Sequence, residues 1–292
     1  MARLSSQIRI KSVQCISPEG LHHMAYKEWG ASDNRNVLIC VHGVTRVSDD
    51  FDALASALSG RYRVICPDIV GRGRSDWFRN PQHYQVQQYA SDLVTLIARS
   101  DADSISYVGT SMGGMIGMGL AALKESPIRK MVLNDIGPVL NVSALGRIGQ
   151  YIGQPVTFSS YAEAAGYIRS ISATFGEHTD EQWHKLCSDV LKQDKDGRWV
   201  KHYDISLAVP MQAITPELAQ ASQLMLWAAY DAITCPVLLL RGKESDLLSQ
   251  ETAIEMTGRG PRARLIEFEK VGHAPTLVHP DQIAAITGFL LE

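Results

Sequence analysis

The chain has 292 residues, of which 45% are hydrophobic and 20% are charged, a composition far from that of disordered proteins. At this length, one α/β core with an inserted subdomain can form. The 28 basic and 31 acidic residues give a formal net charge of −3, so no basic surplus exists to neutralise a phosphate backbone, and binding to nucleic acid is not expected.

The first half of the chain alternates β-rich and helical segments. The expected strands cover residues 8–16, 22–30, 37–42, 62–66, 105–109 and 131–134, and the expected helices cover 49–58, 84–100 and a segment from Met112. Residues 37–42 and 62–66 lack the polar and apolar alternation of a half-exposed strand, which is typical of strands covered on both faces by helices. This order predicts a parallel sheet.

The alternation stops after Pro138 and resumes at Cys235. Between these positions the sequence favours helices at 161–174, 181–191 and 216–230 and offers no convincing strand. Afterwards it predicts two strands, 236–242 and 263–269, and two helices, 250–257 and 281–291. We therefore predict an α/β fold in which residues 1–137 and 232–292 form the core and residues 138–231 form an inserted helical cap.

A candidate nucleophile follows the strand at 105–109. Residues 109–113 read Gly-Thr-Ser-Met-Gly and run into an apolar helix. The G-x-S-x-G pattern between a strand and a helix is typical of a sharp turn that holds the serine in a strained conformation with its hydroxyl exposed. Ser111 is therefore the predicted nucleophile.

A serine nucleophile needs a histidine base, and the histidine needs a carboxylate that orients it. His273, in Gly-His-Ala-Pro after the last strand, is the predicted base, because His279 precedes Pro280 at the start of the final helix. Asp246, in the loop after residues 236–242, is the favoured acid, because it lies between the serine and the histidine in the chain. Glu244 in the same loop and Asp135 at the end of the strand 131–134 remain alternatives.

Acyl transfer also needs two N–H groups that stabilise the developing oxyanion. One is expected from Met112, immediately after the serine, and the other from Val44, in the loop after residues 37–42. His42, at the start of this loop, is interpreted as a structural brace.

Four motifs stand in the order that the α/β-hydrolase superfamily has them: V-H-G-V, D-I-V-G-R-G-R-S-D, G-T-S-M-G-G and G-H-A-P. The chain resembles this superfamily over residues 1–137 and 232–292. The resemblance implies a mostly parallel eight-stranded sheet, flanked by helices, whose second strand is antiparallel. Ser111 stands where the haloalkane dehalogenase and epoxide hydrolase branches carry aspartate, which argues against those branches. Among the serine branches, the tail G-H-A-P-T-L-V-H-P resembles that of the small carboxylesterases.

The expected activity is cofactor-independent hydrolysis of small to medium carboxylic esters through an acyl-enzyme. The first alternative is hydrolysis of a carbon–carbon bond in a vinylogous diketone, although the related C–C hydrolases usually carry tryptophan where this chain has Ala274. The second is a small-molecule receptor without catalysis, because one fold hosts many functions. No metal site is expected, since His22 and His23 are adjacent in a strand pattern and point to opposite faces.

A cytoplasmic location without a membrane partner is expected. The longest nearly continuous apolar stretch, 113–123, is shorter than the ~18 residues needed to span a bilayer. The N-terminus, MARLSSQIRIKSV, lacks the apolar core of a secretory signal. Free, buried thiols are expected where cysteines lie in or beside apolar runs, at Cys15, Cys40, Cys66 and Cys235.

Overall fold

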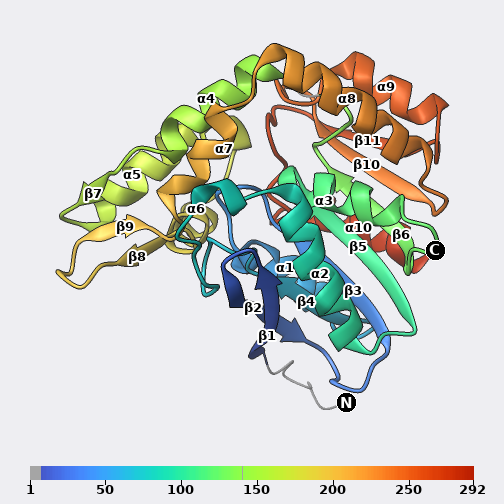
Figure 1. Cartoon of the computed structure of the whole chain (residues 1–292), viewed down its shortest axis with the longest axis horizontal. Helices are drawn as coiled ribbons and strands as arrows, with labels where there is room; N and C mark the ends of the chain where they lie inside the picture. The colour runs from blue at the N-terminus through green and yellow to red at the C-terminus, as the bar shows by residue number, and fades with distance from the viewer. Residues whose placement is uncertain (1–7, 140) are drawn as a thin grey trace.

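The computed structural model describes residues 8–139 and 141–292, and the argument against a secretory signal falls partly on residues 1–7, outside this range. An eight-stranded sheet crosses the molecule in the order β1-β2-β4-β3-β5-β6-β10-β11 (Figure 1). Its strands are β1 (Arg9–Ser17), β2 (Gly20–Trp29), β3 (Asn36–Val41), β4 (Arg63–Pro67), β5 (Ser104–Thr110), β6 (Ile128–Asn134), β10 (Val237–Gly242) and β11 (Arg264–Phe268). β2 is antiparallel to β1 and β4, and the other neighbouring pairs are parallel. The predicted α/β-hydrolase sheet is confirmed.

Helices cover both faces of this sheet. The core helices are α1 (Asp52–Leu58), α2 (Val86–Ser100), α3 (Met112–Ala121), α9 (Gln250–Gly258) and α10 (Pro280–Leu291). Inner strands contribute alternate side chains to the two layers: Leu38 and Cys40 of β3 pack with α1 and α10, whereas Val37 and Ile39 pack with α2 and α3. A sheet buried on both faces explains why these strands are continuously apolar in sequence.

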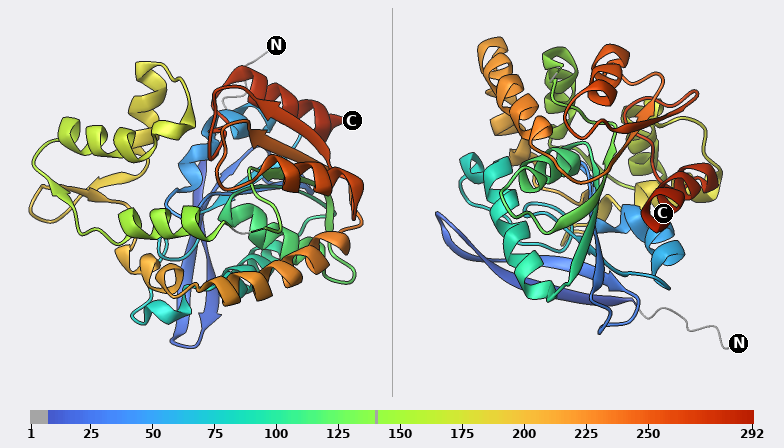
Figure 2. Two further views of the ribbon diagram at one scale, coloured as in Figure 1. Left: turned by 90° about the horizontal axis from the view of Figure 1, so that it is seen from above. Right: turned by 90° about the vertical axis from the view of Figure 1, so that its right-hand side faces the viewer.

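The chain between β6 and β10 forms a layer beside the sheet over residues 142–201, which lie on the left in Figure 1 and extend away from the core in Figure 2, and it ends in a helix, residues 216–231, at the upper right of Figure 1. It contains α4 (Val142–Ile152), β7 (Thr157–Phe158), α5 (Tyr161–Ile171), α6 (Asp180–Ser188), β8 (Leu191–Gln193), β9 (Trp199–Lys201), α7 (Ala208–Gln212) and α8 (Pro216–Asp231). We call this segment the insertion. It has a small apolar cluster of its own, formed by Ala164, Ile168, Cys187, Val190 and Leu191.

The insertion contains two helices that the sequence analysis did not place, α4 and α7, and it differs from its predicted form in two further respects. β7, β9 and β8 form a three-stranded antiparallel sheet where the sequence predicted no strand, because strands of two or three residues are too short to show an alternating pattern. α8 packs against α3 of the core, so the last helix of the insertion covers the sheet. The predicted boundaries after residues 137 and 231 therefore mark where the insertion begins and ends in the sequence. They do not separate it from the core in space, because α8 packs on the core.

All five cysteines are buried and free, which confirms the expected environment of Cys15, Cys40, Cys66 and Cys235. None of the helices within residues 8–139 and 141–292 combines the length and the apolar character that crossing a membrane requires.

Candidate active site

Ser111 lies in the sharp turn between β5 and α3. Its φ of 51° and ψ of −116° belong to a region that residues with a Cβ rarely adopt. Its backbone N–H donates to the carbonyl oxygen of Asn134 at the end of β6, over 3.0 Å, which fixes the turn against the neighbouring strand. The strained turn presents the serine side chain to a pocket at the carboxyl edge of the sheet.

The glycines on both sides of Ser111 are required by close backbone packing. A Cβ on Gly109 would lie 2.5 Å from the backbone of Gly113, and a Cβ on Gly113 would lie 2.1 Å from the carbonyl oxygen of Val41 on β3. Because these distances are far below van der Waals contact, β5, α3 and β3 can meet here only without side chains. The G-x-S-x-G pattern thus reflects this packing.

His273 connects Ser111 to a buried carboxylate. Its Nε2 lies 2.9 Å from Ser111 Oγ, and its Nδ1 lies 2.7 Å from Asp135 Oδ2. Asn134 ties the two loops together, since its side-chain amide donates to the carbonyl oxygen of Pro275 over 2.8 Å and to Thr110 Oγ1 over 3.0 Å. The predicted serine and histidine are therefore in hydrogen-bond contact.

Asp135 is completely buried, directly after β6. Besides His273, it accepts hydrogen bonds from the N–H of Gly242 over 2.9 Å and from the hydroxyl of Ser245 over 2.6 Å. These three donors replace the water that the carboxylate loses on burial. Asp135 is thus held in one orientation behind the imidazole.

The predicted pairing of Asp246 with His273 is wrong. Asp246 is partly exposed, and its carboxylate forms an ion pair with Arg147 of α4. Glu244 is exposed as well, so the third candidate, Asp135, is the one that contacts the histidine. The reason is the register of the sheet: β6 and β10 pair with Asn134 opposite Leu240, which brings Asp135 beside Gly242, whereas Asp246 lies further out in the loop.

The sequence does carry a signal that favours Asp135. It lies in the apolar segment M-V-L-N-D-I-G, whereas Asp246 lies in the polar segment G-K-E-S-D. A carboxylate in an apolar segment tends to be buried, and buried carboxylates need hydrogen-bond partners. Chain order admits both positions, and the sequence analysis favoured Asp246 without weighing the apolar segment around Asp135.

The two predicted oxyanion donors come from the loop after β3 and from the start of α3. Val44 borders the pocket after β3, and Met112 is the first residue of α3, where backbone N–H groups have no acceptor within the helix. His42 Nε2 accepts from the N–H of Ile69 over 3.0 Å, so the protonated Nδ1 donates to the carbonyl oxygen of Gly43 over 2.7 Å. Burial lowers the pKa of His42 to about 4, so a neutral imidazole holds the loop that carries Val44.

Arg72 is a residue of this site that the sequence analysis did not single out. It is buried, its Nε donates to the carbonyl oxygen of Val44 over 2.9 Å, and its Nη2 contacts the sulfur of Met112 at 3.3 Å. One guanidinium therefore contacts both residues from which oxyanion donors are expected. The motif D-I-V-G-R-G-R-S-D contains Arg72 and supports the family resemblance, but it does not indicate this contact.

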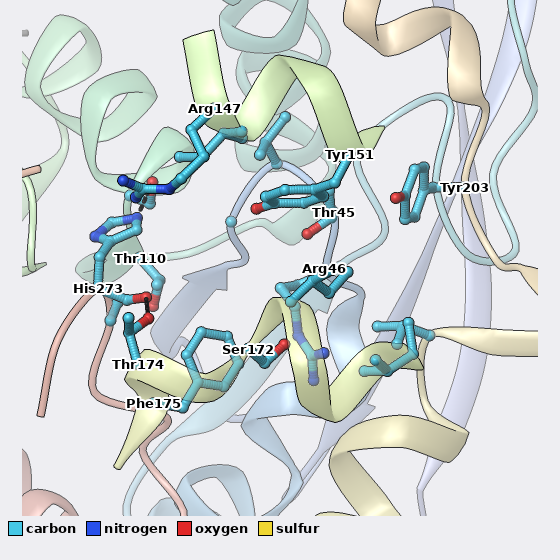
Figure 3. Close-up of a pocket in the computed structure, with 18 residues that line it drawn as sticks. Thr45, Arg46, Thr110, Arg147, Tyr151, Ser172, Thr174, Phe175, Tyr203 and His273 are labelled. Carbon is cyan, nitrogen blue, oxygen red and sulfur yellow. Dashed lines mark hydrogen bonds between the residues drawn. The ribbon is translucent and has the colours of Figure 1, made fainter. Parts of the chain in front are cut away.

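The pocket has one wall from the core and one from the insertion (Figure 3). The core contributes the loop after β3, Ser111 and His273, whereas the insertion contributes α4, α5 and the segment around Thr174. Thr174 Oγ1 donates to the carbonyl oxygen of His273 over 3.3 Å, and the N–H of Gly272 donates to the carbonyl oxygen of Thr174 over 2.7 Å. The insertion is thus hydrogen-bonded to the loop that carries the histidine.

Among residues 8–139 and 141–292, one group of three side chains has metal-binding donor atoms close together: Cys15, His22 and Asp92, whose donors lie within 4.8 Å of one another. His22 Nε2 is hydrogen-bonded to Asp92 over 3.0 Å and so joins β2 to α2. Burial, reinforced by the nearby Asp92 carboxylate, raises the pKa of Cys15 to about 12. Because metals bind the thiolate, these contacts favour a structural role for the group.

Comparisons with known proteins agree with this geometry. A family model described as "Alpha/beta hydrolase family" matches residues 38–286. The chain is 53% identical over 289 residues to a 3-hydroxybutyrate-oligomer hydrolase from Cupriavidus necator, covering 98% of this chain and 99% of the relative. It is 26% identical to esterase YbfF from Escherichia coli, covering 86% of this chain and 91% of the relative.

A solved structure shares the same fold over nearly the whole chain. An alpha/beta hydrolase from Novosphingobium aromaticivorans superposes with a TM-score of 0.86 at 34% identity, and the match covers 98% of this chain and 99% of that structure. The family model and the full-length relatives lead to the same conclusion. The chain belongs to the alpha/beta hydrolase family and is an enzyme of that family that hydrolyses ester bonds.

Proposed function

We propose that the protein hydrolyses oligomers of 3-hydroxybutyrate through an acyl-enzyme on Ser111. The observation that carries the proposal is the relative of that name, which is 53% identical over 98% of this chain. The hydrogen-bonded chain of Ser111, His273 and Asp135 at the pocket supports the acyl-enzyme route.

In the first half-reaction, Ser111 Oγ attacks the ester carbonyl while His273 Nε2 takes the hydroxyl proton. Asp135 accepts the Nδ1–H bond and stabilises the imidazolium that forms. The N–H groups of Val44 and Met112 hold the oxyanion of the tetrahedral intermediate. His273 then gives its proton to the departing alkoxide, which leaves as the hydroxy acid.

In the second half-reaction, water takes the place of the alcohol. His273 removes a proton from the water, which attacks the acyl-enzyme carbonyl, and the second tetrahedral intermediate collapses to free acid and Ser111. Every step uses groups of this chain and water, so the proposed route needs no cofactor.

The proposal extends to the setting of the enzyme. We infer that residues 138–231 act as a cap that shapes the substrate pocket, because α4 and α5 supply part of its lining. We infer a cytoplasmic location, because five buried thiols without a disulfide suit a reducing compartment.

The test compares the parent with Ser111→Ala on the linear dimer of 3-hydroxybutyrate, with monomer release followed by liquid chromatography. We expect Ser111→Ala to lower kcat by about 100,000-fold, because the nucleophile is lost while the fold remains. Ser56→Ala, at an exposed serine of α1, is the matched control and should keep the parent rate.

A fluorophosphonate probe and peptide mass spectrometry locate the activated serine without any assumption about the substrate. We expect one adduct, on Ser111, in the parent and in Ser56→Ala. Dimer hydrolysis that persists in Ser111→Ala would refute the acyl-enzyme route. If Ser111 forms the adduct but the dimer is not hydrolysed, 3-hydroxybutyrate oligomers are not the substrate. Other esters and ring-cleavage diketones would then be tested.

A further inference from the structure

Two side chains with permanent positive charge line the described pocket, Arg46 and Arg147, and they are held very differently. Arg46 is buried and pairs with Asp50 through two guanidinium nitrogens, Nε over 2.9 Å and Nη2 over 2.6 Å. The geometry of a bidentate pair leaves little capacity for a ligand. Arg46 is therefore part of the pocket wall.

Arg147 is positioned to accept a second anionic partner. Its side chain is 57% exposed, and Asp246, which it contacts through Nη2, is 40% exposed. Within residues 8–139 and 141–292 this carboxylate is its one ion-pair partner. A guanidinium offers five donors, and the contact of Nη2 with Asp246 leaves donors for another carboxylate while Asp246 keeps the side chain oriented.

Arg147 also lies at the end of the pocket where the leaving alcohol departs. In Figure 3 its side chain extends from α4 toward His273, whereas Tyr203 lies at the opposite end of the pocket. In the proposed mechanism, His273 protonates the alkoxide, so the leaving group must lie beside the imidazole. A substituent on that leaving group therefore lies closer to Arg147 than to the end of the pocket at Tyr203.

The proposed substrate carries a carboxylate at this place. In an ester of 3-hydroxybutyrate, one methylene separates the carbon that bears the alkoxy oxygen from the carboxyl carbon. At the last ester bond of a linear oligomer, this carboxyl is a free carboxylate on the leaving group. We propose that Arg147 binds that carboxylate and thereby makes the enzyme selective for esters whose alcohol half is a short hydroxy acid.

This inference rests on the proposed function. Besides selectivity, it predicts the end of the oligomer at which hydrolysis begins. Because the carboxylate belongs to the alcohol half, hydrolysis begins at the carboxyl end of the oligomer and releases one hydroxy acid at a time. A trimer labelled at its hydroxyl end should give labelled dimer and unlabelled monomer as the first products.

The test measures kcat/KM for the free-acid dimer and for its methyl ester, which has one added methyl group and no charge, and it follows in both the cleavage of the ester bond between the two hydroxybutyrate units. We expect the parent to prefer the acid, and Arg147→Met to lower the acid-to-methyl-ester ratio by about 10-fold, which corresponds to about 1.4 kcal/mol. Arg147→Lys should recover part of the ratio, since it keeps the charge but not the planar fork. Arg198→Met is the matched control, because Arg198 is 53% exposed, forms ion pairs in the β8–β9 turn and lies outside the pocket lining.

Equal ratios in the parent and in Arg147→Met would overturn the inference while the proposed function stands. If the parent cleaves neither dimer nor methyl ester, the proposed function fails, and a second measurement decides on Arg147. Inhibition of p-nitrophenyl butyrate hydrolysis by 3-hydroxybutyrate is compared with inhibition by its methyl ester. Stronger inhibition by the acid that disappears in Arg147→Met supports the carboxylate site, and equal inhibition by both compounds overturns it.

Discussion

The two walls of the pocket are held in place by different means. On the core side, Ser111 and His273 are fixed by buried hydrogen bonds to Asn134 and Asp135, and those residues are fixed by neighbouring strands. On the insertion side, the pocket residues stand on α4 and α5, next to a small apolar cluster of five buried residues. The pocket residues of the core are therefore positioned by the sheet, whereas those of the insertion are positioned by a segment with only a small apolar cluster of its own.

This difference separates two tasks of the enzyme. Bond cleavage needs groups held within a few tenths of an ångström, and buried parallel strands provide such positions. Substrate selection needs a surface that can vary without disturbing those groups, and an insertion between β6 and β10 can vary in this way. We expect substitutions in the core wall to act mainly on kcat and those in the insertion to act mainly on KM.

Within this comparison, the largest expected effect comes from replacing each of the two aspartates that the sequence offered as the acid, Asp246 as the favoured one and Asp135 as an alternative. Asp135→Asn should lower kcat by about 1,000- to 10,000-fold, because an amide in place of the carboxylate favours the wrong imidazole tautomer and cannot stabilise the imidazolium. Asp246→Asn should lower kcat on a neutral ester by less than about 10-fold, because Asp246 contacts Arg147 and not His273. Steady-state kinetics on p-nitrophenyl butyrate measures both.

Each variant serves as the control for the other, because both convert one carboxylate into an amide. Asp135 lies at the end of β6, and Asp246 lies in the loop after β10. Circular dichroism and thermal unfolding establish that both are folded. A larger loss of kcat in Asp246→Asn than in Asp135→Asn would mean that the resting hydrogen bonds of His273 are not those of the reaction.

The core was predictable because its motifs reflect backbone constraints. Gly109 and Gly113 are needed where strands and helix meet, so G-x-S-x-G predicts Ser111 as the nucleophile from sequence alone. The acid was not predictable in the same way, because Asp135 and Asp246 both follow parallel strands and reach the same edge of the sheet. The apolar segment around Asp135 favours its burial, but which of the two faces His273 depends on the pairing of β6 with β10, a long-range register that no local pattern contains.

The insertion was less predictable for a related reason. Its helices α5, α6 and α8 carry helical patterns, but β7, β8 and β9 are two or three residues long, and β7 pairs with β9 across more than forty positions of sequence. The sequence likewise did not predict that Arg147 lines the pocket, because exposed arginines are common on helices and only the fold places this one at the pocket. Local sequence therefore predicted the elements better than the side chains that meet between them.

The second prediction concerns pH and the core wall. Burial lowers the pKa of His42 to about 4, whereas an unfolded histidine has its ordinary pKa of 6.5. Between these values the unfolded chain binds a proton that the folded chain does not, so the free energy of unfolding falls as the pH falls. Because one pKa unit corresponds to about 1.4 kcal/mol, the contribution of His42 to this loss is about 3 kcal/mol between pH 6.5 and 4.

Urea unfolding at several pH values measures this dependence. His42→Gln keeps a donor and an acceptor but does not titrate, so its unfolding free energy should vary less with pH than that of the parent. Val108→Ala, a buried change on β5 without a titratable group, should lower stability equally at every pH. If His42→Gln and Val108→Ala showed the same pH dependence, His42 would not be the group that resists protonation.

The smallest expected effect tests the insertion wall. Lys201 of β9 is buried, and its ammonium donates to three carbonyl oxygens at and just beyond the end of α4: Tyr151 over 2.5 Å, Ile152 over 3.3 Å and Gln154 over 3.0 Å. Lys201→Met keeps the length of the side chain but removes the donors, which leaves helix-end carbonyls unsatisfied and costs about 2 kcal/mol. Hydrogen exchange should then accelerate in residues 142–152, with an increase of a few fold in KM.

Lys195→Met is the matched control, because Lys195 is exposed in the β8–β9 turn of the same layer. It should leave the exchange of α4 at the parent rate. The informative comparison is between kcat and exchange in Lys201→Met. If α4 loosens while kcat stays near the parent value, the insertion positions the substrate without positioning Ser111 or His273. If kcat falls together with the hydrogen-exchange protection of α4, the change in the insertion reaches His273 through the hydrogen bonds between Thr174 and the His273 loop. The two walls then act as one unit.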